Sequence, residues 1–394
     1  MSWPMVKLKD CCTVVGGATP KRNISEYWDS RDVPWVTPKD ISKLSNKVLD
    51  DAPEYISQIG FDKCATYLLP KGSVLLTSRA PIGNVAIAGR DMCTNQGFKS
   101  LVPSDCIDST YLYYCMLMHS PKLEALGNGA TFKEVSKKIV EEFEIPLPPL
   151  AEQKRIASIL DKADAIRRKR QQAIELADEF LRAVFLDMFG DPVMNPKGLK
   201  KAPITELADV ITGFAFKSSE YVSESENSVR LCRGANTLTG YFDWKDTVYW
   251  PQDKLAKLDS YLIHEGDVIL AMDRPWISSG LKVCVFPQNE PLTYLVQRVA
   301  RLRPKDPIFS DYIYSCIKSQ SFEKHCCPTE TTVPHISPVE LKKYEVLIPS
   351  ERLINQYHSI ASILNKNLQR MQYCEMESEG IFNSLSQKAF SGEL

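Results

Sequence analysis

The chain has 394 residues, of which 44% are hydrophobic and 25% are charged. These values are typical of folded globular proteins, and the length is sufficient for two or three domains. Its 48 Lys and Arg residues nearly balance 49 Asp and Glu residues, so the overall charge gives no indication of nucleic-acid binding. A basic surface must then be local, or be shared with a partner.

Neither export nor a membrane span is expected. The first residues, MSWPMVKLKD, lack the basic and apolar regions of an export signal, and no apolar run approaches ~18 residues. The 12 cysteines are scattered and form no CxxC pair. This favours reduced thiols in the cytoplasm over a disulfide framework or a structural zinc site.

The first part of the chain is punctuated by Gly, Pro and Asn and carries short β-prone runs, such as SVLLT (73–77) and NVAIA (84–88). This pattern predicts a globule made mainly of twisted strands with some helices. Near its start, VVGGATPKR lacks the second glycine and the GK[ST] of a phosphate-binding loop. We interpret it as a turn from a strand into a loop.

A long helix is predicted from about Ala151 to Phe189, after the proline-rich PLPPL. Its apolar residues recur at spacings of three and four, and Arg167 and Arg170 interrupt the series. This spacing is typical of a coiled-coil seam, in which polar interruptions fix register and partner. The residues expected to pair on this helix are Ile156, Leu160, Ile174, Leu181 and Val184.

The remainder of the chain repeats the first half in the same order. YLLPKGSVLLTSR (67–79) aligns with YLIHEGDVILAMDR (261–274), with one residue inserted before the arginine, and NQGFKSLVP (95–103) aligns with VQRVARLRP (296–304). The word IASIL occurs both at 156–160 and at 360–364. The chain is therefore a diverged tandem repeat.

A second long helix is predicted from Arg352 to Phe390, interrupted at Asn367 and Ser378. A helix of ~40 residues is ~60 Å long, longer than a small domain is wide, which favours pairing of the two helices as a rod between the globules. The alternative is that each helix lies separately on its own globule. The residues expected to pair on this helix are Ile360, Leu364, Met371, Ile381 and Leu385.

Several motifs resemble the specificity subunit of Type I restriction-modification systems, in order and along the whole chain. They include GGATPKRNISEYWDSRDVPWVTPKDI (16–41), LPKGSVLLTSRAPIGNVAIA (69–88), IPLPPLAEQKRIASIL (145–160), MFGDP with NPKG (188–198) and SLSQKAFSGEL (384–394). The resemblance implies an α+β fold with two target-recognition domains separated by two long antiparallel helices. It implies target-recognition domain 1 at 1–148, a central conserved helix at 149–190, a linker and target-recognition domain 2 at 191–348, and a distal conserved helix at 349–394.

The resemblance also implies a protein without chemistry of its own, whose two domains each read one half of a bipartite, asymmetric site in double-stranded DNA. The helices would set the spacer between the halves. Two methyltransferase subunits and the restriction subunits would supply the reactions, with S-adenosylmethionine, ATP and Mg on those partners. The sequence contains neither an NPPY-like motif nor GxxxxGK[ST]. The alternatives are a coiled-coil scaffold that binds only proteins and a fused methyltransferase, for which the length leaves no room.

Polar residues that differ between the copies are candidates for reading bases, whereas matching residues are candidates for the fold or for phosphate contact. Arg79 and Arg274, which match in the alignment, are interpreted as backbone clamps or structural ion-pair residues. The run RRKR (167–170) is interpreted as a solvated helix face or a contact to spacer phosphates. The residues expected to face DNA are Lys39, Arg79, Asn84, Lys99 and Lys133 in the first copy and Arg233, Asn236, Arg274, Trp276, Lys282, Arg298 and Arg301 in the second.

One cluster of possible zinc ligands, HCCPTETTVPH, contains His325, Cys326, Cys327 and His335. Adjacent cysteines seldom bind one ion well, and the aligned stretch of the first copy, EALGNGATFKE, has no Cys or His. We therefore expect no metal there.

The tandem repeat predicts that a fragment ending near Pro196 forms a homodimer. Such a fragment keeps one globule and one helix, and its exposed apolar seam can pair with a second copy of itself. With the methyltransferase it should then direct methylation to an inverted repeat of the first half-site. Sedimentation measures the oligomeric state, and a fragment that remains monomeric at high micromolar concentration would contradict the pairing of the helices.

Overall fold

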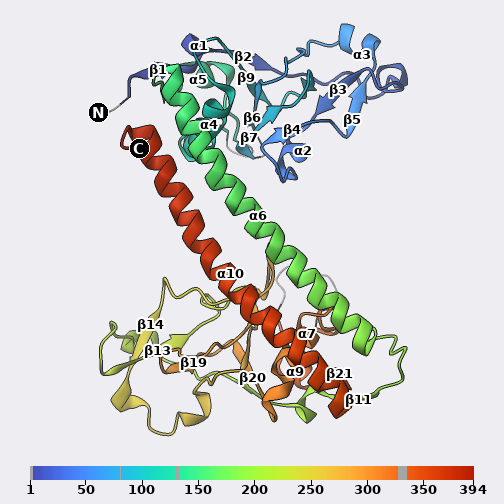
Figure 1. Cartoon of the computed structure of the whole chain (residues 1–394), viewed down its shortest axis with the longest axis vertical. Coiled ribbons are helices and arrows are strands. Elements are labelled where there is room, and N and C mark those ends of the chain that lie inside the picture. Colours follow the sequence, from blue (N-terminus) through green and yellow to red (C-terminus); the bar gives the residue numbers. More distant parts are fainter. Residues whose placement is uncertain (1–2, 80, 130–132, 327–334) are drawn as a thin grey trace. The chain divides into compact units, whose positions relative to one another are not determined.

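The computed structural model describes residues 3–79, 81–129, 133–326 and 335–394. The chain forms two compact units: unit 1 consists of Met1–Lys169 and Glu377–Leu394, and unit 2 of Arg170–Met376. Each of the two long helices, α6 (Leu150–Phe189) and α10 (Glu351–Ser391), therefore contributes one part to each unit (Figure 1). Both helices end within two residues of the predicted limits.

Unit 1 is built on a five-stranded sheet of order β2-β9-β6-β7-β4, and it also contains the three-stranded sheet β5-β3-β8 and the pair β1-β10. Its strands are β1 (Met5–Lys7), β2 (Cys12–Gly16), β3 (Val33–Val36), β4 (Val48–Leu49), β5 (Glu54–Ile56), β6 (Val74–Ser78), β7 (Ile82–Ala88), β8 (Cys93–Thr94), β9 (Lys99–Pro103) and β10 (Glu144–Pro146). Its shorter helices are α1 (Leu8–Cys11), η1 (Ser25–Tyr27), α2 (Pro38–Ser42), α3 (Gln58–Asp62), α4 (Ser109–Ala125) and α5 (Lys137–Glu142).

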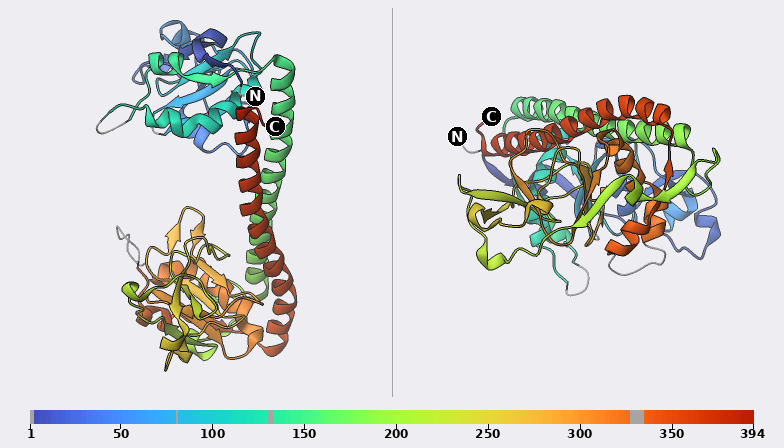
Figure 2. Two further views of the ribbon diagram at one scale, coloured as in Figure 1. Left: turned by 90° about the vertical axis from the view of Figure 1, so that its left-hand side faces the viewer. Right: turned by 90° about the horizontal axis from the view of Figure 1, so that it is seen from below.

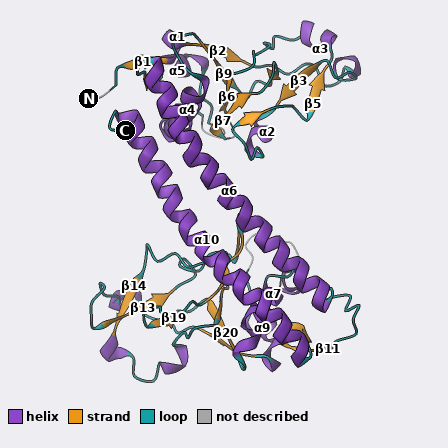
Figure 3. Cartoon of the chain, in the orientation of Figure 1, coloured by secondary structure: helices purple, strands orange, loops and turns teal. Residues whose placement is uncertain are grey.

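Unit 2 contains the four-stranded sheet β12-β20-β15-β18, the three-stranded sheet β14-β13-β19 and the pairs β11-β21 and β16-β17. Its strands are β11 (Lys200–Pro203), β12 (Ala208–Thr212), β13 (Ser228–Cys232), β14 (Val248–Pro251), β15 (Val268–Ala271), β16 (Trp276–Ile277), β17 (Gly280–Leu281), β18 (Val283–Val285), β19 (Thr293–Leu295), β20 (Val299–Pro304) and β21 (Glu345–Ile348). Its shorter helices are η2 (Ile204–Glu206), η3 (Ser218–Glu220), η4 (Gln252–Lys254), η5 (Asp259–Tyr261), η6 (Pro307–Phe309), α7 (Ser310–Ile317), α8 (Gln320–Cys326) and α9 (Pro338–Lys343). In Figure 3 the strands are orange and the helices, α6 and α10 among them, are purple.

The backbone repeats between the units, as the sequence predicts. Val74 pairs with Leu101 in unit 1, and the aligned Val268 pairs with Leu302 in unit 2. In the three-stranded sheets, β3 and β13 are each antiparallel to one neighbour and parallel to the other. VVGGATPKR leaves β2 for a loop, where a Cβ on Gly17 would lie 2.2 Å from the Thr94 carbonyl oxygen. The interpretation of that segment as a turn from strand to loop therefore agrees with the structure.

The alignment of Arg79 with Arg274 is wrong. Arg79 forms an isolated bridge with Glu134, and Asp273, not Arg274, forms the corresponding bridge with His335. The two copies stay in register through the end of the strand, so no residue is inserted before the arginine. Arg274 lies one position further along, at a φ of 44°.

Within each unit, α6 and α10 lie side by side and antiparallel (Figure 1 and Figure 2). In unit 1 the start of α6 packs with the end of α10 in one core, which contains Ile156, Leu160 and Phe382. In unit 2 the end of α6 packs with the start of α10, and Phe189 lies 5.1 Å from Tyr357 between ring centroids. A polar contact also joins α6 to α10, in which Arg170 donates to the Cys374 carbonyl at 2.8 Å.

The residues predicted to pair differ in burial. Ile156, Leu160, Ile174 and Leu181 are buried, and Val184, Leu364, Met371 and Leu385 are partly buried against the two cores. Ile360 and Ile381 are wrong choices, since they are 39% and 59% exposed while Ala361 and Phe382, one residue further, are buried. A helix has 3.6 residues per turn, so a spacing of three and four locates the buried face only to within about one residue.

Within the described residues, no helix combines the length and the apolar character needed to cross a membrane.

Replacing Leu160 with Ala should strongly destabilise the protein. Leu160 is fully buried in the unit 1 core, and removing a buried leucine side chain typically costs ~2–5 kcal/mol of unfolding free energy. Ile166 on the same helix is 57% exposed, so Ile166→Ala is the matched control and should change stability by less than ~1 kcal/mol. Urea unfolding measures both, and equal losses would contradict the burial of the seam at Leu160.

Candidate nucleic-acid interface

In unit 1, α2 is held beside β7 and displays Lys39. Thr37 and Asp40 form a capping box at the start of α2, which fixes the helix locally. The Asn84 side chain on β7 donates from Nδ2 to Ser42 Oγ at 3.0 Å. Asn84 therefore ties α2 to the sheet, while Lys39 is exposed on that helix.

The other predicted residues of unit 1 gather at the end of β6. Lys99 Nζ lies 3.4 Å from Ser78 Oγ and 3.4 Å from Glu134 Oε1, and its side chain is only 15% exposed. Arg79 follows Ser78 directly and is half-buried, and Lys133 precedes Glu134 and is exposed. The structure thus brings the backbones of Arg79 and Lys133 to the segment of Glu134, whose carboxylate pairs with Lys99.

In unit 2, the predicted residues gather at the corresponding end of β15. Arg298 donates from a terminal guanidinium nitrogen to Asp273 Oδ2 at 2.8 Å. Trp276 lies on β16, opposite Leu281, and Lys282 donates its backbone N–H to the Pro275 carbonyl at 2.7 Å.

Two further cations lie at the same end of β15 and differ in exposure. Arg274 is exposed. Burial lowers the pKa of the Lys282 ammonium, because its charged form is partly removed from water. Arg274 is therefore more accessible to a ligand than Lys282.

A loop after β13 brings Arg233 to this end of β15. A Cβ on Gly234, the next residue, would lie 4.0 Å from Lys282 Nζ. Asn236 holds the loop: its Oδ1 accepts from the Arg233 backbone N–H at 3.1 Å, and its Nδ2 donates to the Asp243 carbonyl at 3.0 Å. Asn236 is 1% exposed, so the prediction that it faces DNA is wrong. It supports the loop that carries Arg233.

Arg301 is also wrongly predicted to face DNA. Its guanidinium is buried and donates to the Ser260 and Leu262 carbonyls at 2.8 and 2.9 Å. Burial lowers the pKa of this guanidinium, because its charged form is partly removed from water. The nearby buried Asp267 is satisfied by two hydrogen bonds from Arg303, at 2.9 and 2.7 Å. Arg301 therefore fastens the loop before β15 to the sheet.

The sequence did not predict that Asp273 and His335 lie at the end of β15. Asp273 accepts from Arg298, and the His335 ring Nδ1 lies at hydrogen-bonding distance from the same carboxylate. The incorrect alignment of Arg274 concealed Asp273, and His335 was considered only as a zinc ligand. An alignment of the two copies without the insertion pairs Asp273 with Arg79 and identifies the position.

The run 167–170 is engaged mainly with protein. Arg167 and Arg168 pair with the buried Asp164 at 2.9 and 3.0 Å, and Arg170 donates to α10. Lys169 is the exposed member of the run. The run is therefore a partly solvated helix face in which two arginines also pair with the buried Asp164, and a contact to spacer phosphates stays a prediction.

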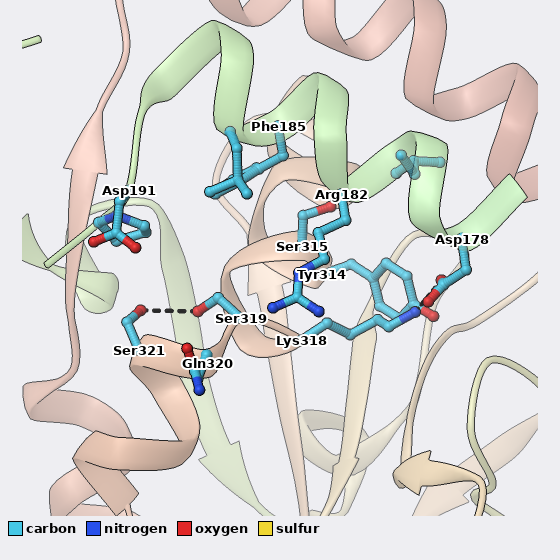
Figure 4. Close-up of a pocket in the computed structure, with 13 residues that line it drawn as sticks. Asp178, Arg182, Phe185, Asp191, Tyr314, Ser315, Lys318, Ser319, Gln320 and Ser321 are labelled. Atoms are coloured by element: carbon cyan, nitrogen blue, oxygen red, sulfur yellow. Dashed lines mark hydrogen bonds and ion pairs between the residues drawn. The ribbon is translucent and has the colours of Figure 1, made fainter. Parts of the chain in front are cut away.

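A cavity of about 130 Å³ in unit 2 lies between the end of α6, α7 and α8 (Figure 4). Its lining includes Phe185, and Lys318 pairs there with Asp178 while Ser319 and Ser321 form a hydrogen bond of 2.8 Å. None of the residues predicted to face DNA lines this cavity. It is therefore separate from the candidate interface.

Within the described parts of the chain, no group of three or more His, Cys, Asp or Glu residues could hold a metal ion. Cys327, one of the four possible zinc ligands, lies outside the described residues.

Asn236→Ala should impair the protein through stability. The substitution leaves the Arg233 N–H and the Asp243 carbonyl, both partly buried, without this side-chain partner, and the loss of such a partner typically costs ~1–3 kcal/mol. Asn227 is an exposed asparagine of the same unit, and Asn227→Ala is the control. Thermal unfolding should show a lower midpoint for Asn236→Ala alone, and an unchanged midpoint would contradict its role as the support of the loop.

Comparisons with known proteins connect the chain to one family. Residues 2–176 match the family described as the Type I restriction modification DNA specificity domain. The Type I restriction enzyme MjaIX specificity subunit of Methanocaldococcus jannaschii is 27% identical over 100% of this chain and 93% of its own length. The MjaVIII specificity subunit of the same organism is 25% identical over 79% of this chain and 77% of its own length.

A solved structure shares the fold. The crystal structure of the Type I restriction-modification system S subunit from M. genitalium matches with a TM-score of 0.62 and 14% identity, covering 99% of this chain and 96% of that one. Residues 2–176 therefore match a Type I restriction modification DNA specificity domain, and the whole chain is similar in sequence to specificity subunits of Type I restriction-modification systems.

Proposed function

We propose that this chain selects the DNA sequence for a Type I restriction-modification complex in the cytoplasm, and that each unit reads one half of a bipartite, asymmetric site. The chain has no reaction of its own in this proposal. It directs two methyltransferase subunits and the restriction subunits, on which S-adenosylmethionine, ATP and Mg act. Residues 1–148 and 191–348 serve as the target-recognition domains, and 149–190 and 349–394 as the helices that set the spacer.

The observation that supports this proposal is the pair of equivalent strand ends with different side chains. The backbone frame repeats, yet Arg79 and Glu134 of unit 1 correspond to Asp273 and His335 of unit 2. Contacts to base edges specify sequence, whereas contacts to phosphates position the protein. Two identical edges would read a symmetric sequence, and two chemically different edges read an asymmetric one.

The proposed DNA-facing surface is local and shared with partners. The whole chain has a formal net charge of −1, so phosphate contacts from the methyltransferase subunits must supply part of the affinity. Asn236 and Arg301 are removed from the proposed surface because they are buried. The proposed surface consists of Lys39, Arg79, Asn84, Lys99 and Lys133 in unit 1 and Arg233, Arg274, Trp276, Lys282 and Arg298 in unit 2.

Mapping methylated adenines tests the proposal. The chain is expressed with its methyltransferase subunit in cells that lack other adenine methylation, and the subunit alone is the control. We expect methylation only where two short sequence blocks are separated by a spacer of constant length. A complex that assembles but methylates without such a bipartite sequence would refute the proposal and favour a scaffold that binds only proteins.

A further inference from the structure

The end of β6 in unit 1 and the end of β15 in unit 2 are equivalent positions. Val135 donates its N–H to the Ser78 carbonyl at 2.9 Å, and Ile336 donates to the Met272 carbonyl at 2.9 Å. The next residue in each unit, Arg79 or Asp273, forms the isolated bridge described above. The same point of the frame therefore carries a cation in unit 1 and an anion in unit 2.

The ion pair at this position is reversed between the units. In unit 1 the acid is Glu134, on the segment that returns to the strand end, and Lys99 is its cation. In unit 2 the acid is Asp273, on the strand end itself, and Arg298 is its cation at 2.8 Å. His335 replaces Glu134 and binds the same Asp273 carboxylate.

Arg298 combines exposure with a fixed backbone. Its side chain is 72% exposed, and its carbonyl accepts from the Met272 N–H at 2.9 Å, beside the end of β15. Its φ is 65°, a left-handed conformation that costs free energy for any residue except glycine. Such strain persists mostly where the side chain has a function. A glycine would adopt this backbone conformation without strain, yet the residue is an arginine.

The guanidinium of Arg298 can change partners at little cost. Exposed ion pairs contribute little to stability, and Asp273 keeps His335 as a partner when Arg298 leaves. An arginine that approaches a base edge donates two parallel hydrogen bonds to O6 and N7 of guanine, a pattern offered by guanine alone in the major groove.

We propose that Arg298 is the residue with which unit 2 reads one guanine of its half-site, and that Asp273 is the positioning residue that aims it. This inference rests on the proposed function, since it requires that unit 2 contacts DNA. It adds the base, the donor and the residue that orients the donor.

The test is the methylated sequence of complexes that carry Arg298 variants. With Arg298→Ala, one guanine of the unit 2 half-site should become degenerate, with preference for it reduced about 10-fold to 100-fold, while the unit 1 half-site stays unchanged and shows that the complex is assembled. Arg298→Lys keeps the charge but loses the planar fork, so the same position should relax. Lys305→Ala is the matched control, because this exposed lysine follows the other end of β20.

Arg298→Gly is a third variant of this residue, and it keeps the test valid if the alanine or lysine variant fails to fold. Glycine relieves the positive φ, so this variant should melt at a higher temperature than the parent while losing the same guanine preference. Asp273→Asn should weaken that preference in the parent and have no further effect on it in the Arg298→Ala background. An additive effect of the two substitutions would overturn the positioning role of Asp273.

The failures are distinguishable. If the parent complex methylates a bipartite sequence and the Arg298 variants keep every base of it, this inference is wrong and the proposed function stands. If the variants lose the same affinity for every DNA sequence, and this affinity depends less steeply on salt, Arg298 contacts a phosphate and the inference is again wrong. If the parent recognises no bipartite sequence, the proposed function itself fails.

Discussion

Burial of the apolar faces of α6 and α10 is the interaction on which the rest of the structure depends. Neither unit closes its core with its strands alone. In unit 1 the Phe390 ring lies 5.5 Å from Tyr111, and in unit 2 the Phe189 ring lies 4.8 Å from Tyr312. The two tyrosines are equivalent, and each also donates its hydroxyl to a strand carbonyl, of Pro146 and of Leu347. Each tyrosine thus links the helix pair to the strands of its unit.

This shared packing explains how two copies of one frame diverged in function. The buried positions are constrained, because a change of one methylene in a dense core is felt by its neighbours. The strand ends are not constrained in this way. Glu134 and His335 occupy the same bridge position, and although their side chains differ, the next residue in each unit, Val135 or Ile336, keeps the equivalent backbone hydrogen bond. The frame can therefore be conserved between the copies while the polar edge changes.

The sequence predicted what local patterns encode. The repeat, the two long helices and the β-rich character of both halves follow from periodicity and from Gly and Pro punctuation, and the structure confirms them. It could not predict the burial of single polar residues, since that depends on partners distant in the chain. Arg301 is buried by carbonyls about 40 positions away, and nothing adjacent to it distinguishes it from Arg298. The prediction that Ile360 and Ile381 lie on the buried face of α10 was wrong for a related reason. The strands, as well as the other helix, decide which face of a helix is covered.

The discontinuity of unit 1 has a consequence for how the protein is made. Unit 2 is one continuous segment, 170–376, whereas unit 1 needs residues 377–394 to be complete. Trp3 donates its indole N–H to the Ala389 carbonyl, so a bond at the beginning of the chain waits for its end. Synthesis of the ~200 intervening residues at ~5–20 residues per second takes ~10–40 s. The unit that leaves the ribosome first is therefore the last to close, and for that interval the apolar side of Ile156 and Leu160 lacks its cover from α10.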